Sequence, residues 1–237
     1  MSNKWFYGFI VFVLINYSFY SQNVKSGEII YQKQMIIDQE KVTAKDVLSK
    51  GVAAISSKHT YVLLFNENRS KFTFQDNMDN ESSSKDKYYS KLAYILCNDY
   101  NYYYDKVNDK GGVIEYGDGI LIADTVKLDW IITNENKMIG EYLCYKATYL
   151  TRMKNYKGVE KEILITAWFA PSIPISFGPK KYKGLPGLIL ELQDQLSIVY
   201  ATNIKLKEII DAKIVFPNGE VISEDEYAKK MKAQMGM

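Results

Sequence analysis

The chain has 237 residues, with 30 basic and 28 acidic side chains. This near balance gives no broad electrostatic field that would favour nucleic acid or an anionic membrane. Twenty tyrosines and five prolines favour strands over helices, which argues against an all-α fold, and the length suits one domain with one core.

The N-terminus has the pattern of a secretory signal peptide over residues 1–21. Lys4 precedes an apolar run, Trp5–Ile15, which is followed by small and polar residues. The run is shorter than the roughly 20 residues that span a bilayer, so a retained anchor is the less favoured alternative. We expect cleavage after Ser21, and a mature chain, residues 22–237, that forms a single β-rich domain without a transmembrane segment. Its expected location is the periplasm or the cell surface.

The first part of the mature chain predicts a strand, a short helix and a hairpin. Residues 27–37 alternate so that Ile29, Tyr31 and Lys33 share one strand face. Residues 39–50 are expected to form an exposed helix. Residues 61–65 and 71–75 are β-rich and flank a polar turn, which predicts a hairpin.

The next segment is polar and then rich in tyrosine. Residues 76–87 lack apolar anchors and are expected to be a solvated loop. Tyrosines crowd residues 88–104, where they either pack within the sheet or line a ligand channel, and packing is favoured. Short strands are expected at 113–116, 120–123 and 126–132.

The C-terminal half has the clearest strand pattern, at residues 142–150, 162–169, 188–192 and 198–206. Ser223 and Glu226 then form a capping box that opens a helix through Gln234. The predicted fold is mainly β (α+β): a single twisted, curved antiparallel sheet with one to three helices, either curled into a half-barrel or packed on helices.

Several ordered blocks in this half resemble one family. They are Trp130, Cys144–Ala147, Ala167–Phe169, Ile173–Pro179 and Gly184–Leu190. In these blocks the chain resembles the GLPGLI family of exported Bacteroidetes proteins, whose biochemical role is uncharacterised. The resemblance implies export and a curved sheet similar to the half-barrel of periplasmic lipoprotein carriers, and it carries over no catalytic residues.

The segment from Trp168 to Leu190 is stiffened by prolines and glycines. As a structural corner, the favoured interpretation, its key residues are Trp168, Pro174, Gly178, Pro179, Gly184, Leu185, Pro186, Gly187, Leu188 and Ile189. As the lip of a binding site, its candidate ligand-binding residues are Trp168, Lys180, Lys181, Tyr182 and Lys183. The lysines, with the amides of the nearby glycines, are also a weaker candidate for an anion site.

Catalytic and metal-binding patterns are weak. His59 is the single histidine and is expected to be polar surface, so we assign no catalytic residues, no metal site and no cofactor. Cys97 and Cys144 are either a disulfide, which export would permit, or two buried thiols, which is favoured.

These observations favour an exported, non-enzymatic protein that binds an apolar ligand or an envelope protein partner. One alternative is a hydrolase that acts on glycans through paired carboxylates. Another is a purely structural component of the cell surface.

Overall fold

The computed structural model describes residues 26–36, 46–75, 83–96, 100–107, 111–115, 119–154, 160–207 and 214–234. In this part of the chain three helices accompany one sheet of twelve strands. The strands are β1 (Ser26–Met35), β2 (Thr60–Asn66), β3 (Arg69–Gln75), β4 (Asn101–Asp105), β5 (Gly111–Glu115), β6 (Leu121–Asp124), β7 (Ile131–Ile139), β8 (Tyr142–Lys154), β9 (Glu160–Ala170), β10 (Leu188–Gln193), β11 (Ser197–Lys207) and β12 (Val221–Ile222). The helices are α1 (Asp46–Ser56), α2 (Ser84–Leu96) and α3 (Glu224–Gln234).

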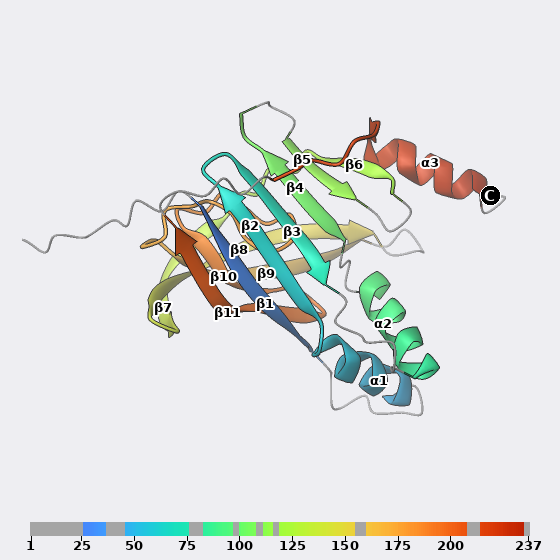
Figure 1. Cartoon of the computed structure of the whole chain (residues 1–237), viewed down its shortest axis with the longest axis horizontal. Helices are drawn as coiled ribbons and strands as arrows, with labels where there is room; N and C mark the ends of the chain where they lie inside the picture. Colours follow the sequence, from blue (N-terminus) through green and yellow to red (C-terminus); the bar gives the residue numbers. More distant parts are fainter. Residues whose placement is uncertain are drawn as a thin grey trace, which may run out of the picture.

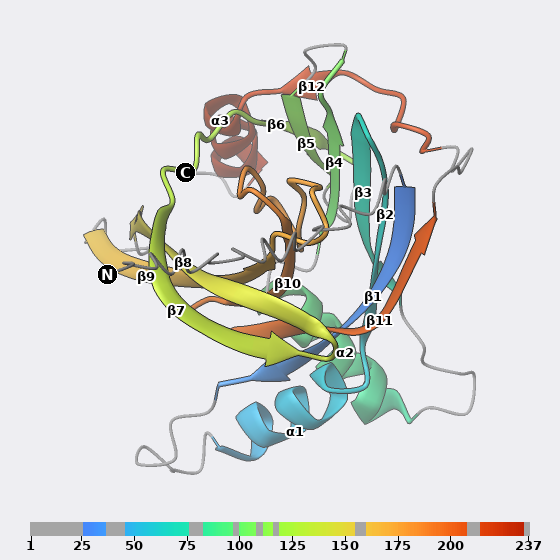
Figure 2. The ribbon, with the colours of Figure 1, turned by 90° about the vertical axis from the view of Figure 1, so that its left-hand side faces the viewer.

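The sheet is open, twisted and strongly curved. Its strand order is β12-β6-β5-β4-β3-β2-β1-β11-β10-β9-β8-β7, with β12 and β6 parallel and the other pairs antiparallel. The strand pairings of β1, β7 and β10 each contain a register shift, an irregularity that bends a sheet. Figure 2 shows β4–β6 and β7–β9 on either side of the orange segment that follows β9. The predicted mainly-β class, with a single curved sheet and one to three helices, is confirmed.

Strand alternation places a continuous apolar row on one face of the sheet, which we call the inner face. Directly paired residues from β1 to β6 form this row: Ile29, Leu63, Phe72, Tyr102, Ile114 and Ile122. Tyr31 and Lys33 lie on the same face of β1 as Ile29, as the sequence predicts, and all three are buried.

Residues 171–187, which we call the corner segment, pack against this inner face. Ile173, Ile175 and Phe177 join the main core, where the Phe177 ring lies 6.4 Å from Phe65 of β2 and 5.8 Å from Tyr104 of β4. Tyr182 and Leu185 join a second cluster built on β8 and β9. Much of the inner face is therefore filled by the protein's own side chains.

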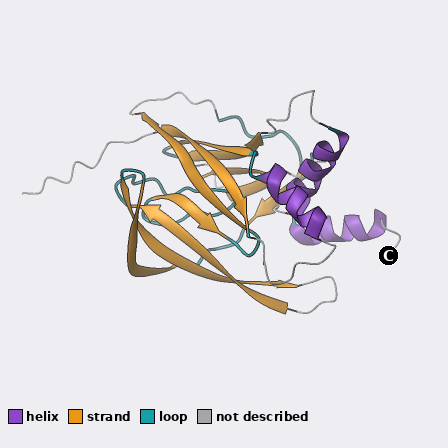
Figure 3. Cartoon of the chain, turned by 90° about the horizontal axis from the view of Figure 1, so that it is seen from below, coloured by secondary structure: helices purple, strands orange, loops and turns teal. Residues whose placement is uncertain are grey.

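Two helices pack against each other at one end of the strands (Figure 1, Figure 3). Val52 and Ile55 of α1 meet Tyr89 and Ala93 of α2 in a small cluster, with Met35 at the end of β1. At Gly51 a Cβ atom would lie 2.3 Å from the Tyr89 ring, so a side chain there would displace this ring. No described helix is long and apolar enough to cross a membrane.

The predictions for the middle of the chain need four corrections. Residues 84–96 form α2, whereas the sequence favoured a loop followed by strand packing, because Tyr89 and Ala93 are spaced to bury one helical face on α1. Helix α1 covers Asp46–Ser56 rather than 39–50, and residues 37–45 lie outside the described part.

The other two corrections concern a strand and a histidine. Residues 125–130 are irregular because the Trp130 indole donates a hydrogen bond to the Lys183 carbonyl, so the strand begins at Ile131. His59 is buried and not at the surface; its Nε2 lies 2.9 Å from Ser90 Oγ and its ring packs against Phe74.

Candidate functional site

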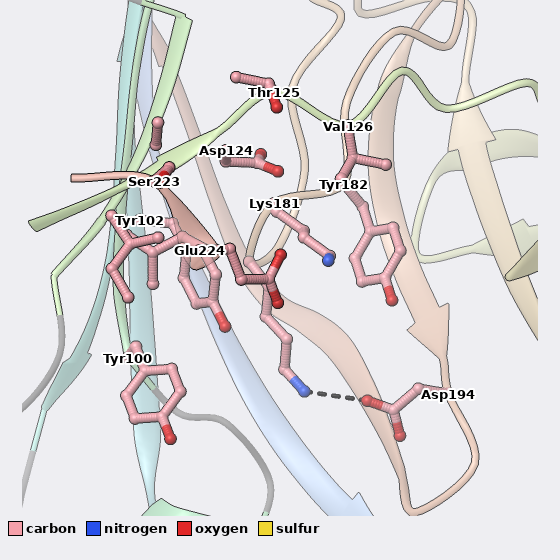
Figure 4. Close-up of a pocket in the computed structure, with 14 residues that line it drawn as sticks. Tyr100, Tyr102, Asp124, Thr125, Val126, Lys181, Tyr182, Asp194, Ser223 and Glu224 are labelled. Atoms are coloured by element: carbon pink, nitrogen blue, oxygen red, sulfur yellow. Dashed lines mark hydrogen bonds and ion pairs between the residues drawn. The ribbon is translucent and has the colours of Figure 1, made fainter. Parts of the chain in front are cut away.

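A cavity of about 370 Å³ lies between the inner face of β4–β6 and the corner segment (Figure 4). Segments far apart in the chain surround it: β4–β6, the corner segment, the β10–β11 turn and the start of α3. Its lining residues are Tyr100, Tyr102, Ile114, Ile122, Ala123, Asp124, Thr125, Val126, Lys180, Lys181, Tyr182, Asp194, Ser223 and Glu224.

The register of β4–β6 builds one wall of the cavity. Tyr102 is paired with Ile114, and Ile114 is paired with Ile122, so the three side chains share the inner face. Phe216 covers the opposite face of these strands, against Tyr103, Val113 and Leu121. The chain then pairs β12 with β6, which brings Ser223 and Glu224 to the cavity.

Lys180 and Asp194 form an ion pair on the other wall, with Nζ 2.9 Å from Oδ2. Lys180 has a positive φ of 55°, a conformation that non-glycine residues rarely adopt. Oδ1 of Asp194 accepts hydrogen bonds from the amides of Leu196 and Ser197. Burial alone would raise the pKa of Asp194, but the Lys180 ammonium and these amides outweigh it and lower the pKa below its usual value.

A second ion pair joins the corner segment to β6. Lys183 Nζ lies 3.0 Å from Asp124 Oδ2, and the Asp124 side chain is only 5% exposed. The Lys183 ammonium also lies 4.9 Å from the centre of the Tyr104 ring. Oδ1 of Asp124 has no hydrogen-bond partner among the described residues, so it can accept a hydrogen bond from a bound molecule.

Three further polar groups at the cavity lack a protein partner within the described part of the chain: the Lys181 ammonium, the Glu224 carboxylate and the Tyr182 hydroxyl. Tyr182 as a whole is only 8% exposed. Burial, followed by the charge of Asp194, raises the pKa of Tyr182, so its hydroxyl stays protonated and can donate. The cavity thus offers both hydrogen-bond donors and acceptors.

Two of the three carboxylates at the cavity are paired with lysines. A glycan hydrolase with paired carboxylates needs one carboxyl with a raised pKa as general acid. Asp194 has a lowered pKa and a lysine partner, and Asp124 is held by Lys183. None of the lining residues is a histidine or a cysteine.

Of the five candidate ligand-binding residues, Lys180, Lys181 and Tyr182 line the cavity, and Lys183 contacts it through Asp124. Trp168 lies elsewhere. By strand alternation it points away from Ala167 and Phe169, which pack near Tyr182, and its ring lies 4.4 Å from the Lys137 ammonium. Lys137 is in turn paired with Glu191 at 2.7 Å.

Most donors of the candidate anion site, which consists of the lysines and the glycine amides, already have partners within the protein. Lys180 and Lys183 are neutralised by carboxylates. The Gly184 amide donates to the Ser176 carbonyl at 2.8 Å, and the Gly187 amide donates to the Leu185 carbonyl at 2.8 Å. Of these groups, only Lys181 is left to attract an anion.

The structural-corner interpretation has direct support in backbone geometry. Gly184 has a φ of 92°, and at Gly187 a Cβ atom would lie 2.3 Å from the Ala170 carbonyl oxygen. Leu185, Leu188 and Ile189 are buried, whereas Pro174 and Pro186 are exposed. These features support the structural role proposed for this run.

Sequence reasoning missed most of the other lining residues, among them Asp124, Asp194 and Glu224. Asp194 lies in the turn between β10 and β11, and Glu224 follows the Ser223 cap of α3, so neither position marks a binding residue in the sequence. Their common site depends on pairings between distant strands, for which a single sequence carries no local signal. The tyrosine-rich stretch was the one hint, since Tyr100 and Tyr102 belong to it.

Cys144 is buried, and no disulfide joins it to another described residue. Burial raises its pKa to about 11, with a small opposing effect of Lys137, so the thiol is unreactive near neutral pH. Cys97 lies outside the described residues, so the disulfide and the favoured alternative, two buried thiols, both stay predictions.

Comparisons with known proteins place the chain only coarsely. A family model described as "Protein of unknown function (Porph_ging)" matches residues 151–191, which include Gly184–Leu190, and this family is associated with Bacteroidetes. A search of curated proteins finds no match.

Two solved structures of PNGF-II, in space groups C2 and P21, are similar to this chain. Each is 15% identical, with TM-scores of 0.49 and 0.51, and the alignments cover 87% and 86% of this chain. The chain spans about a third of the length of PNGF-II, since 32% of that protein is covered. The similarity to the P21 structure, with its TM-score of 0.51, supports the overall fold and no more detailed property.

Proposed function

We propose that this chain is an exported, non-enzymatic binding protein that holds a small polar molecule in the cavity between β4–β6 and the corner segment. One observation carries the proposal: the buried Tyr182 has a hydroxyl without a partner in the described structure, at a cavity that Lys181 and Glu224 also line. The hydroxyl is not enclosed by protein, so it is accessible to a molecule in the cavity, and the three polar groups together can fix the orientation of that molecule.

A polar ligand replaces the apolar ligand expected from sequence. The apolar part of the inner face is packed by Ile173, Ile175 and Phe177, which leaves an apolar molecule little room there. The remaining cavity exposes lysines, carboxylates and tyrosines. Burying these groups against hydrocarbon would cost free energy, whereas a polar ligand would satisfy them.

Native mass spectrometry of protein purified from its own host tests the binding function. The wild-type protein should carry a small-molecule adduct, and the Thr125→Trp variant should lose it because an indole at this exposed lining position fills the cavity. Thr202→Trp, at an exposed position on β11, is the matched control and should keep it. An adduct that Thr125→Trp retains, or no adduct on folded wild type, would refute the proposal.

Export rests on the sequence pattern of residues 1–21. When the full-length chain is expressed, cell fractionation should find its processed form outside the cytoplasm, with Gln22 as the first residue. A chain expressed without residues 2–21 should stay in the cytoplasm. Equal distribution of both forms would contradict export.

A protein partner is the second candidate. It is favoured by Ile131, Leu150 and Leu164, exposed apolar residues that lie close together on β7–β9 because Leu150 is paired with Leu164 and Ile131 with Thr148. Under this candidate, an envelope protein should form a stoichiometric complex with the wild type and not with Leu150→Ser/Leu164→Ser. A complex that the double variant still forms would refute it.

A further inference from the structure

We infer that the cavity recognises a neutral saccharide of one or two rings. This inference rests on the proposed binding function and adds the chemical class of the ligand. It follows from the charge balance of the cavity, its hydrogen-bonding groups and its tyrosines.

The ion pairs at the cavity argue against a ligand of one charge sign. Lys180 forms an ion pair with Asp194, and Lys183 forms an ion pair with Asp124. One cation, Lys181, and one anion, Glu224, remain at the cavity. An anionic ligand would meet three carboxylates, and a cationic ligand would meet Lys180 and Lys181, so the balance favours a molecule without net charge.

The unpartnered groups match the chemistry of hydroxyls. Asp124 Oδ1 and the Glu224 carboxylate are acceptors, while the Lys181 ammonium and the Tyr182 hydroxyl are donors. A hydroxyl donates one hydrogen bond and accepts others, so neighbouring hydroxyls on a sugar ring can satisfy both kinds of group at once. An apolar molecule or a simple ion can satisfy only part of this set.

Two aromatic rings complete the fit. Tyr100 and Tyr102 line the wall that faces Asp194, as Figure 4 shows. A tyrosine ring offers a flat apolar face next to a polar tip, which suits a molecule with C–H groups on its faces and hydroxyls at its rim. The volume of about 370 Å³ is near the lower end of small-molecule sites, which limits the ligand to one or two rings.

Isothermal titration of the mature full-length chain with defined probes tests the ligand class. The neutral probes are cellobiose, maltose and N,N′-diacetylchitobiose; N-acetylneuraminic acid is the anionic probe and glycylglycine the zwitterionic one. At least one neutral disaccharide should bind with millimolar or tighter affinity. Glu224→Gln and Lys181→Met should each weaken this binding at least tenfold.

Matched controls at exposed positions away from the lining are Glu162→Gln and Lys161→Met on β9, and both should bind as the wild type does. Circular dichroism and the thermal midpoint verify that each variant is folded. Because Lys181 and Glu224 have no partners in the described structure, their loss should not unfold the protein.

Each outcome separates the ligand class from the binding function. Binding of glycylglycine or N-acetylneuraminic acid without any neutral disaccharide would overturn the saccharide inference and leave the cavity as a binding site. If none of the probes binds while the wild-type protein still carries an adduct from its host, the saccharide inference would also be overturned and the cavity would remain a binding site. Saccharide binding that both variants keep unchanged would place it outside this cavity and also overturn the inference.

Discussion

Lys180 is the residue on which the geometry of the site most depends. It adopts a left-handed conformation without being glycine, it is buried, and its ammonium reaches Asp194 in the turn between β10 and β11. A strained backbone persists only where the surroundings enforce it. Here the ion pair and the packing of the neighbouring Tyr182 supply that enforcement, and together they hold one wall of the cavity.

The stability from Asp194 should depend on pH in a defined direction. Its pKa is lower in the folded protein than the unfolded value of about 3.9. Asp194 therefore stabilises the fold above that value and loses this contribution as pH falls through the folded pKa. Asp194→Asn should be less stable than wild type by about 2 kcal/mol at pH 7, and the difference should shrink below pH about 4.

Urea unfolding of both proteins from pH 7 to pH 2.5 measures this difference. A difference in stability between the two proteins that widens as pH falls would contradict a lowered pKa of Asp194 in the folded protein.

Gly187 is the residue where a side chain should be tolerated least. A Cβ atom would approach the Ala170 carbonyl oxygen to 2.3 Å, and backbone cannot move aside cheaply. We expect Gly187→Val to lower the free energy of unfolding by at least about 3 kcal/mol, whereas Pro186→Val, at an exposed neighbour, should change it by less than about 1 kcal/mol. Denaturant unfolding measures both values. A Gly187→Val protein as stable as wild type that had lost ligand binding would show that the corner is a functional lip.

At the scale of elements, local signals decided which predictions held. The capping box at α3 is present as predicted: Ser223 Oγ accepts from the Glu226 amide at 3.2 Å, and the Ser223 amide donates to Glu226 at 2.8 Å. The Ser223 amide and the Ser223 hydroxyl both donate to the Glu226 carboxylate, and these two hydrogen bonds lower its pKa. Helix α2 was missed because tyrosine favours strands on average, and only the neighbouring α1 makes the helical spacing of Tyr89 and Ala93 useful.

The cap of α3 should be measurable as local stability. Loss of an N-cap serine typically costs about 1 kcal/mol, which predicts that Ser223→Ala speeds amide hydrogen exchange in α3 about fivefold. Ser223→Asn, which keeps a capping side chain, should stay near wild type. Hydrogen-exchange mass spectrometry of α3 peptides makes the comparison, and equal protection in the alanine variant would show that the cap does not hold the helix.

At the scale of the whole molecule, the corner segment joins two parts of the curved sheet. We call them its arms: one contains β2 and β4, and the other contains β8 and β9. Phe177 contacts Phe65 and Tyr104 on one arm, and Tyr182 and Leu185 pack on β8 and β9 in the other. The ion pairs of Lys180 and Lys183 add polar links across the same gap. The cavity exists because the segment fills only part of the space between the arms.

This bridging role predicts cooperative unfolding. Phe177→Ala should cost about 3 to 5 kcal/mol, the usual effect of deleting a buried phenylalanine, and should still give one transition. Tryptophan fluorescence reports Trp130 and Trp168 near one arm, and far-UV circular dichroism reports all strands. The two signals should coincide in wild type and variant; separate midpoints in wild type would show that the arms unfold independently.

The sequence by itself determined the mainly-β class, most C-terminal strands and the cap of α3, because each depends on residues within about ten positions. The tertiary structure alone decided that His59 is buried and that 84–96 is a helix. It also brought Lys180, Lys181 and Tyr182 together with Asp124, Asp194 and Glu224, and separated them from Trp168. The physical reason is that strand pairing and curvature join residues distant in the chain, and neither composition nor periodicity records which faces will meet.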